Sequence, residues 1–123
     1  MATANAAATL ARADDWVADF ATQEMKVLAG ANVLATHTLA GFVTSNDVND
    51  ALATANAISD ETITGAGTQT ADSATISDGT KTYTLSVGTT GSGADLILST
   101  LTYINGETSS INSLVARFKS ASA

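Results

Sequence analysis

The sequence contains no cysteine and no proline, and His37 is its single histidine. Without cysteine the chain forms no disulfide and offers no thiolate ligand, and one imidazole gives no basis for a histidine metal site. Large apolar side chains are also scarce, because 24 of the hydrophobic residues are alanine. Alanine buries little area, so a chain of 123 residues is expected to have a thin core. Small domains offset a thin core with disulfides, metals or oligomerisation, and by elimination we expect oligomerisation.

Positive charge is scarce as well. Five Lys and Arg residues stand against twelve Asp and Glu residues, so the net charge is −7 at pH 7. The five cations are scattered, which argues against nucleic acid partners and anionic membranes, because phosphate groups need clustered Lys and Arg. The first residues lack the basic and apolar regions of a standard signal peptide, and no run approaches the roughly 20 apolar residues of a membrane span. We therefore expect a protein made in the cytoplasm, with no membrane or nucleic acid partner.

Threonine and serine are abundant, with 32 residues together, whereas charged residues make up only 14% of the chain. A surface of small, uncharged side chains suits close packing against other subunits, because few charges need to be desolvated. The alternative is a threonine-rich β protein without such contacts. We favour assembly.

Residues 4–29 carry apolar side chains at helical spacing among many alanines, which predicts a helix that ends before Gly30. Its apolar stripe is dominated by Trp16 and Phe20. Two alternatives stay open for this pair. The two rings pack on residues 83–87 of the same chain, or they dock into a neighbouring subunit.

Residues 32–44 alternate, with apolar side chains on both faces. This pattern favours a strand that is buried on both sides or lies in an interface, and a helix is the competing interpretation. Ser45 or Asn46 can cap a following helix, which we predict over residues 47–58.

Residues 71–87 form the clearest pattern in the chain. Apolar and polar residues alternate on both sides of Asp78-Gly79, and glycine accepts a positive φ there without a Cβ clash. The pattern predicts a β-hairpin. Residues 59–71, which are small and polar, predict a linker or an edge strand before it.

The C-terminal third predicts one more strand and one more helix. Residues 96–104 favour a strand that ends at the turn signal Asn105-Gly106, with a helix as the alternative. Ser109 or Ser110 can then cap a C-terminal helix. Its apolar residues recur at i, i+3, i+4 and i+7, and they are Ile111, Leu114, Val115 and Phe118.

Candidate chemistry is weak throughout. His37 would be needed for a Ser–His–Asp arrangement, but no G-x-S-x-G nucleophile motif is present. The carboxylates of Asp14 and Asp15 are adjacent on the predicted helix and therefore do not face each other. Asp72 and Asp78 lack the spacing of a calcium loop. We predict no catalytic residue, no metal ligand and no cofactor.

One group of motifs supports a resemblance. Its residues are Thr64-Gly65, Ala74-Thr75-Ile76, Asp78-Gly79-Thr80, Tyr83-Thr84-Leu85 and the stretch from Ser110 to Phe118. They resemble a recurring element of virion structural proteins of tailed bacteriophages, in which a Gly/Thr-rich lead-in precedes a hairpin and a downstream helix. The resemblance implies a capsid decoration, head-fibre or tail protein located in the virion. It supplies no catalytic residues.

Together these observations predict an α+β protein with a helical N-terminal half, a small antiparallel β-hairpin unit and a C-terminal helix. The expected segments are residues 1–60 and 61–123, which could also form a single domain. We expect a non-enzymatic structural subunit that binds copies of itself and other virion proteins. The alternative is a binding or adhesion module that uses a threonine-rich β surface. The expected interface residues are Trp16, Phe20, Val33, Leu39, Phe42, Ile111, Leu114 and Phe118.

Overall fold

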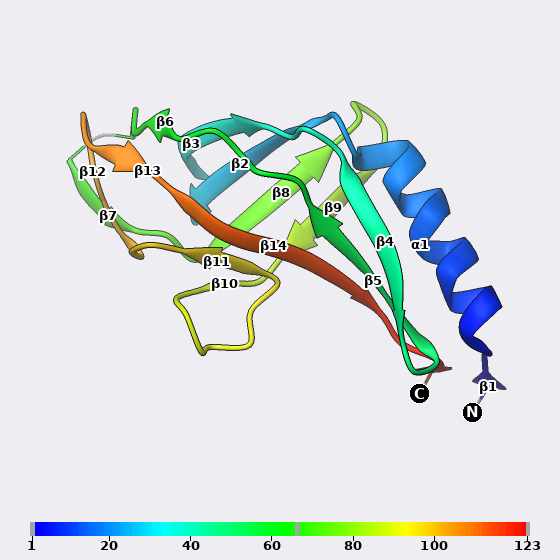
Figure 1. The fold of residues 1–123 in the computed structure, drawn as a ribbon. Helices are drawn as coiled ribbons and strands as arrows, with labels where there is room; N and C mark the ends of the chain where they lie inside the picture. Colours follow the sequence, from blue (N-terminus) through cyan, green and yellow to red (C-terminus); the bar gives the residue numbers. More distant parts are fainter. Residues whose placement is uncertain (1, 66, 123) are drawn as a thin grey trace.

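The computed structural model describes residues 2–65 and 67–122, which form one helix and fifteen strands (Figure 1). The expected α+β class, with a helical N-terminal half and a C-terminal helix, is therefore wrong. The helix is α1 (Ala6–Phe20), and most of the remaining chain is β structure. No helix of the described residues is long and apolar enough to cross a membrane.

Most strands belong to two larger sheets, with orders β3-β2-β8-β9 and β10-β11-β14-β5-β4. Three two-stranded sheets, β1-β15, β12-β7 and β13-β6, complete the fold. The strands are β1 (Ala2–Thr3), β2 (Glu24–Ala29), β3 (Asn32–Thr38), β4 (Phe42–Asp47), β5 (Asp50–Ala55), β6 (Glu61–Thr62), β7 (Thr68–Thr70), β8 (Ser73–Ser77), β9 (Thr82–Leu85), β10 (Val87–Gly88), β11 (Leu96–Leu98), β12 (Thr102–Ile104), β13 (Thr108–Ser109), β14 (Ile111–Phe118) and β15 (Ala121–Ser122).

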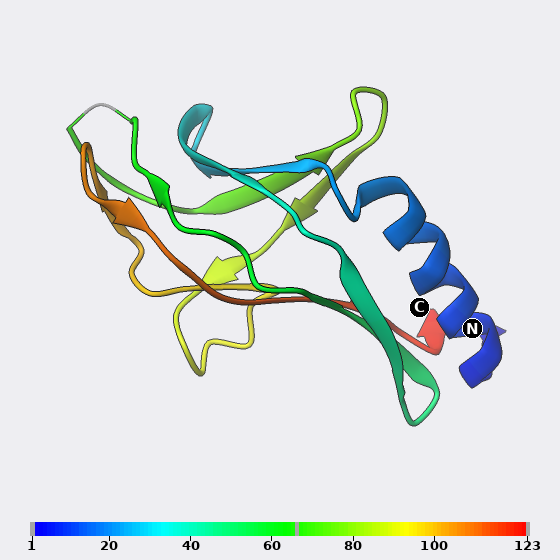
Figure 2. The ribbon, with the colours of Figure 1, turned by 45° about the horizontal axis from the view of Figure 1, so that its top comes forward.

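The two larger sheets enclose the hydrophobic core. Met25 and Ile76 from the four-stranded sheet and Leu96 and Leu114 from the five-stranded sheet belong to one buried cluster. Both sheets combine strands from either side of residue 60, because β2 pairs with β8 and β5 pairs with β14. Figure 2 shows the same arrangement, with α1 at one end of the sheets and the two chain termini close together.

Helix α1 begins where Asn5 accepts a hydrogen bond from the Ala8 N–H at 3.0 Å, as expected for an N-cap residue. It ends at Phe20, not at residue 29 as predicted. Residues 24–29 form strand β2 instead, because Met25 and Val27 are buried while Glu24 and Lys26 are exposed. This alternation has the period of a strand.

The helix predicted over residues 47–58 is also wrong, since this segment is part of the hairpin β4–β5. Ala51 and Ala53 in β5 are fully buried beneath α1. Alanine in these inward positions lets the helix approach the sheet closely. The turn contains Val48, whose φ of 58° is unusual for a β-branched residue.

The predicted hairpin is confirmed. Strands β8 and β9 pair with Ile76 opposite Tyr83 and Ala74 opposite Leu85. The strand predicted over 32–44 is confirmed for β3, but the chain turns after Thr38 and starts β4 at Phe42. The strand predicted over 96–104 is two strands, β11 and β12, which belong to different sheets.

The predicted C-terminal helix is wrong, because Ile111–Phe118 is strand β14 in the middle of the five-stranded sheet. Leu114 and Ala116 are buried, and Phe118 packs against the same core. These three residues alternate as in a strand. The larger apolar residues recur at helical spacing for two reasons. The inward position 116 holds a small alanine, and Val115 lies on the opposite face of the strand.

Candidate functional site

Most of the expected interface residues pack against the core of the same chain. Trp16, Phe20, Leu39 and Leu114 are buried, with exposed fractions between 1% and 7%. Of the others, only Val33 is exposed, at 41%. The remaining three, Phe42, Ile111 and Phe118, are half-buried against the core.

Five of the six aromatic residues meet in one cluster around Trp16. The Trp16 ring lies 5.0 Å from Phe42, 5.2 Å from Tyr83, 5.4 Å from Phe20 and 5.9 Å from Phe118, measured between ring centroids. Of the two alternatives for this stripe, the structure therefore shows packing within the chain. The cluster fixes α1 to both sheets, because Tyr83 comes from the four-stranded sheet and Phe118 from the five-stranded sheet.

A buried polar chain crosses the opposite end of the molecule. His37 Nδ1 lies 2.9 Å from the Ser59 carbonyl, and His37 Nε2 lies 2.8 Å from Ser109 Oγ. Tyr103 Oη is 2.6 Å from the same Ser109 Oγ. Since a carbonyl only accepts, Nδ1 is the ring nitrogen that carries the proton in this tautomer. Ser109 then donates to Nε2, and Tyr103 donates to Ser109.

The 2.8 Å between Ser109 Oγ and His37 Nε2 is a distance expected between a nucleophile and its base. Both atoms, however, are enclosed in the protein. His37 is 0% exposed and Ser109 and Tyr103 are 1% exposed each. Burial raises the pKa of the Tyr103 phenol above its usual range. The contact with Ser59 holds the segment after β5 against β3. The geometry therefore supports a structural role for these three side chains.

The outer face of the four-stranded sheet is lined with hydroxyl groups. A hollow of about 400 Å³ lies there between the ends of β2, β8 and β9. No aromatic side chain takes part, because Tyr83 points into the core against Trp16. The lining residues are Glu24, Lys26, Thr75, Ser77, Gly79 and Thr82.

The outer face of the five-stranded sheet is less polar. Val43 in β4 is 61% exposed, and the half-buried Leu52 and Val115 lie on the same face. A second hollow of about 480 Å³ adjoins them beneath the loop that carries Asp95. This face therefore combines exposed apolar area with polar groups at its margin.

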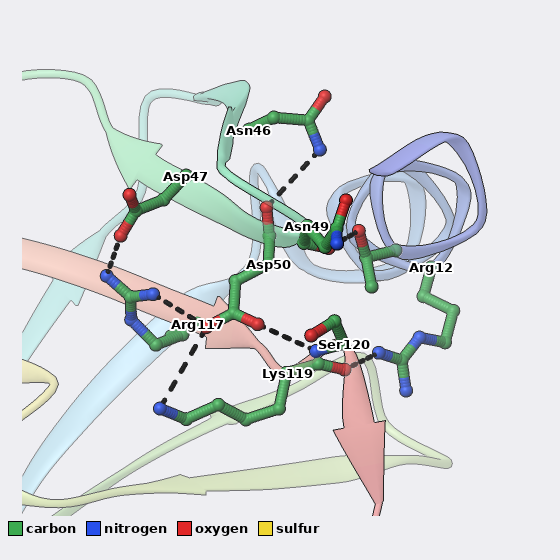
Figure 3. A network of polar contacts seen from close by, with 9 residues as sticks. Arg12, Asn46, Asp47, Asn49, Asp50, Arg117, Lys119 and Ser120 are labelled. Atoms are coloured by element: carbon green, nitrogen blue, oxygen red, sulfur yellow. Dashed lines mark hydrogen bonds and ion pairs between the residues drawn. The ribbon is translucent and has the colours of Figure 1, made fainter. Parts of the chain in front are cut away.

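Charged groups tie the β4–β5 turn to the end of β14 (Figure 3). The two terminal nitrogens of Arg117 donate to Asp47 at 2.7 Å and to Asp50 at 2.9 Å. Asp50 also accepts the Ser120 backbone N–H at 2.7 Å. The Ser120 hydrogen bond and then the Arg117 hydrogen bond lower the pKa of Asp50. Arg12 reaches the Lys119 carbonyl from α1, so the helix, turn and C-terminal strands form one network.

The outer side of β4, which we call the β4 edge, completes the candidate interaction surface. β4 is the last strand of its sheet, and no described strand pairs with its outer side (Figure 1). Its six residue pairs with β5 run without a register shift. Natural sheets protect such edges with Lys, Pro or bulges, and Phe42–Asp47 contains none of them.

Sequence reasoning missed this edge. Part of the signal was present, because the strand predicted over residues 32–44 includes the first three residues of β4. The helix predicted from residue 47 hid the turn that pairs β4 with β5. Of the predicted interface residues, which include four aromatic and four aliphatic side chains, only Val33 is exposed. Val43, Val48, Val33 and Ile104 are the exposed large apolar residues among those described.

No cluster of three or more potential metal ligands occurs in the described part of the chain. A scan of protein-family models, a search of curated proteins and a search of solved structures return no match to this chain. Functional inference therefore depends on the geometry of the candidate surfaces.

Proposed function

We propose that this chain is a non-enzymatic structural subunit of a larger assembly that works through self-association and docking. The observation that carries this proposal is the β4 edge, where no described strand pairs with the outer side of a regular strand and Val43 is exposed. Edge strands of this kind pair readily with other chains. The charge-poor surface supports the same role, because few ions lose water on contact.

We further propose that the assembly is a bacteriophage virion, in which the chain is a capsid decoration, head-fibre or tail component. This part depends on the resemblance of the residues around the hairpin β8–β9. The stretch Ser110–Phe118 does not contribute, because it forms a strand instead of the helix of that element. The partners would be copies of this chain and other virion proteins, without nucleic acid or membrane contact.

The experiment that tests assembly is sedimentation velocity of the purified chain over micromolar concentrations. We expect a defined oligomer or a concentration-dependent increase in mass. A thermally robust monomer at every concentration would contradict self-association. The virion assignment needs a separate measurement, which is mass spectrometry of purified particles from producing cells, with unbound host protein as the control.

A second candidate is a binding or adhesion module, favoured by the hydroxyl-lined hollow on the four-stranded sheet. Five hydroxyl or charged side chains surround it, and threonine and serine can donate and accept hydrogen bonds. Replacing Thr75 and Thr82 with valine should abolish binding to a glycan array but leave assembly intact. Tyr83 is unsuitable for this test, because it packs against Trp16. Unchanged glycan binding would exclude this surface.

A further inference from the structure

The backbone of β4 exposes hydrogen-bonding groups in a definite order. Asp47 pairs with Asp50 across a two-residue turn, which places their backbone groups toward each other. At the other end, the Asn56 N–H donates to the Gly41 carbonyl at 2.9 Å. Odd-numbered residues of β4 therefore bond to β5, since inward and outward groups alternate along an antiparallel strand. The N–H and C=O groups of the even-numbered residues Phe42, Thr44 and Asn46 point away from the sheet.

We propose that the partner at this edge is a second copy of the same chain, bound antiparallel through β4 with a two-fold axis at Thr44. This inference rests on the proposed function and names its contact. In this register Thr44 faces Thr44 of the second copy, and Phe42 faces Asn46. Each of the three pairs exchanges two N–H···O=C bonds. Shifting the register by two residues would leave one outward residue on each strand without a partner.

The charges of β4 suit a second copy. Asp47 is the only charged residue of the strand, and in this register it faces Gly41 of the other chain. No like charges are therefore directly opposed between the strands. On the outer face the exposed Val43 faces Ser45 of the second copy, so both five-stranded sheets join into one. A two-fold arrangement is the commonest symmetry of protein dimers.

The two edges of the four-stranded sheet, β3 and β9, are less suitable. On the outer side of β3, the Leu34 carbonyl accepts the Thr64 N–H at 2.9 Å, so this edge is already used. The β2–β3 pair also contains a register shift. Strand β9 is shorter and follows Lys81, which is a typical protecting residue for an edge.

One group opposes the contact. Thr44 Oγ1 donates to Asp14 Oδ1 at 2.7 Å, which holds the Asp14 carboxylate near the two-fold axis. Two such carboxylates would repel each other across the axis. Salt should therefore strengthen the dimer, and Asp14→Asn should tighten it by roughly two- to threefold at low ionic strength.

Cysteine cross-linking tests the register, because the natural chain has no cysteine. Residues 43 and 45 form a directly opposed pair in the proposed dimer, within the Cα distance that a disulfide spans. An equimolar mixture of Val43→Cys and Ser45→Cys chains should form a mixed disulfide dimer under mild oxidation. Each variant alone should form much less. Equal cross-linking of single variants and mixture would overturn the register.

A charge substitution tests the surface itself. Val43→Lys places cations on both sides of the new contact, and we expect at least a tenfold increase in the dimer dissociation constant by sedimentation. Thr54→Lys is the matched control, because Thr54 is exposed opposite Val43 but lies on the inner strand β5. If both variants still form the native oligomer, the β4 contact is wrong and the proposed function stands. If the natural chain is already a monomer, the β4 contact and the proposed self-association are both wrong.

Discussion

The strands β3 and β4 both lie at the outer margin of a sheet, yet only one of them is open. The segment after β5 folds back along β3, where Thr64 donates to Leu34 and His37 contacts Ser59. Helix α1 contacts the inner face of β4, but no described strand pairs with its outer side, and its pairing with β5 is regular. This chain therefore protects one edge with its own backbone, and we propose that the other edge binds a partner.

The segment that covers β3 is held by the buried hydrogen bonds among His37, Ser109 and Tyr103. Ser109→Ala leaves His37 Nε2 and the Tyr103 hydroxyl without partners. We expect the free energy of unfolding to fall by about 2–4 kcal/mol, because each buried unsatisfied group costs about 1–3 kcal/mol. Urea denaturation measures this change. Tyr103→Phe is the control, since Ser109 still donates to His37, and we expect a loss of about 1 kcal/mol. Equal losses would contradict the proposed direction of donation.

The cover also needs a glycine at position 65. A Cβ added to Gly65 would lie 2.6 Å from Leu34 Cδ2 and 3.3 Å from Leu34 Cα. Leu34 is 1% exposed and has little room to move. We therefore expect Gly65→Ala to lower the free energy of unfolding by about 1–3 kcal/mol and to speed amide exchange in β3. Thr64→Ala, which keeps the backbone and changes an exposed side chain, should have little effect. Unchanged exchange in Gly65→Ala would show that the cover tolerates the methyl group.

On the β4 side, the turn carries strain at Val48. Its φ of 58° disfavours a β-branched side chain, and the side chain is 84% exposed. Val48→Gly should raise the free energy of unfolding by about 0.5–1 kcal/mol, after the greater entropy of glycine in the unfolded chain is subtracted. Thermal unfolding measures the gain. Val48→Ala keeps the Cβ and should recover little of it. A loss of stability in Val48→Gly would mean that the valine side chain makes a stabilising contact.

The smallest expected effect concerns pH at the same turn. The Ser120 N–H and Arg117 hold the pKa of Asp50 below the usual 3.8, so the folded chain favours the carboxylate. Its stabilising contribution is complete above the usual pKa and is lost as the pH falls through the lowered value. Exchange of the Ser120 amide should therefore accelerate in strong acid. Asp50→Asn should weaken this acid dependence of Ser120 amide exchange. If the acceleration in acid is unchanged in the variant, another group causes it.

The amino-acid sequence was sufficient where local chemistry decides the structure. Asp78-Gly79 between two alternating segments predicted the hairpin β8–β9, and the alanine-rich segment around Trp16 predicted α1. Asp78 also shapes its own turn, because its side chain accepts the N–H groups of Thr80 and Lys81. Such contacts lie within a few residues and leave a clear pattern in the sequence.

Strands β5 and β14 show what the sequence left undecided. Their inward positions include Ala51, Ala53 and Ala116, so the larger apolar residues recur at helical spacing. These alanines are inward because α1 and the sheet core need short side chains there, and that requirement exists only in the folded chain.

The candidate site was undecided for the same reason. A sequence pattern shows that Trp16 and Phe20 are apolar, but not which surface covers them. By itself the sequence determined the helix, the hairpin and a charge-poor surface. Only the tertiary structure decided that the aromatic residues meet inside the chain and that β4 lies at an open edge, because strand order depends on contacts between residues far apart in sequence.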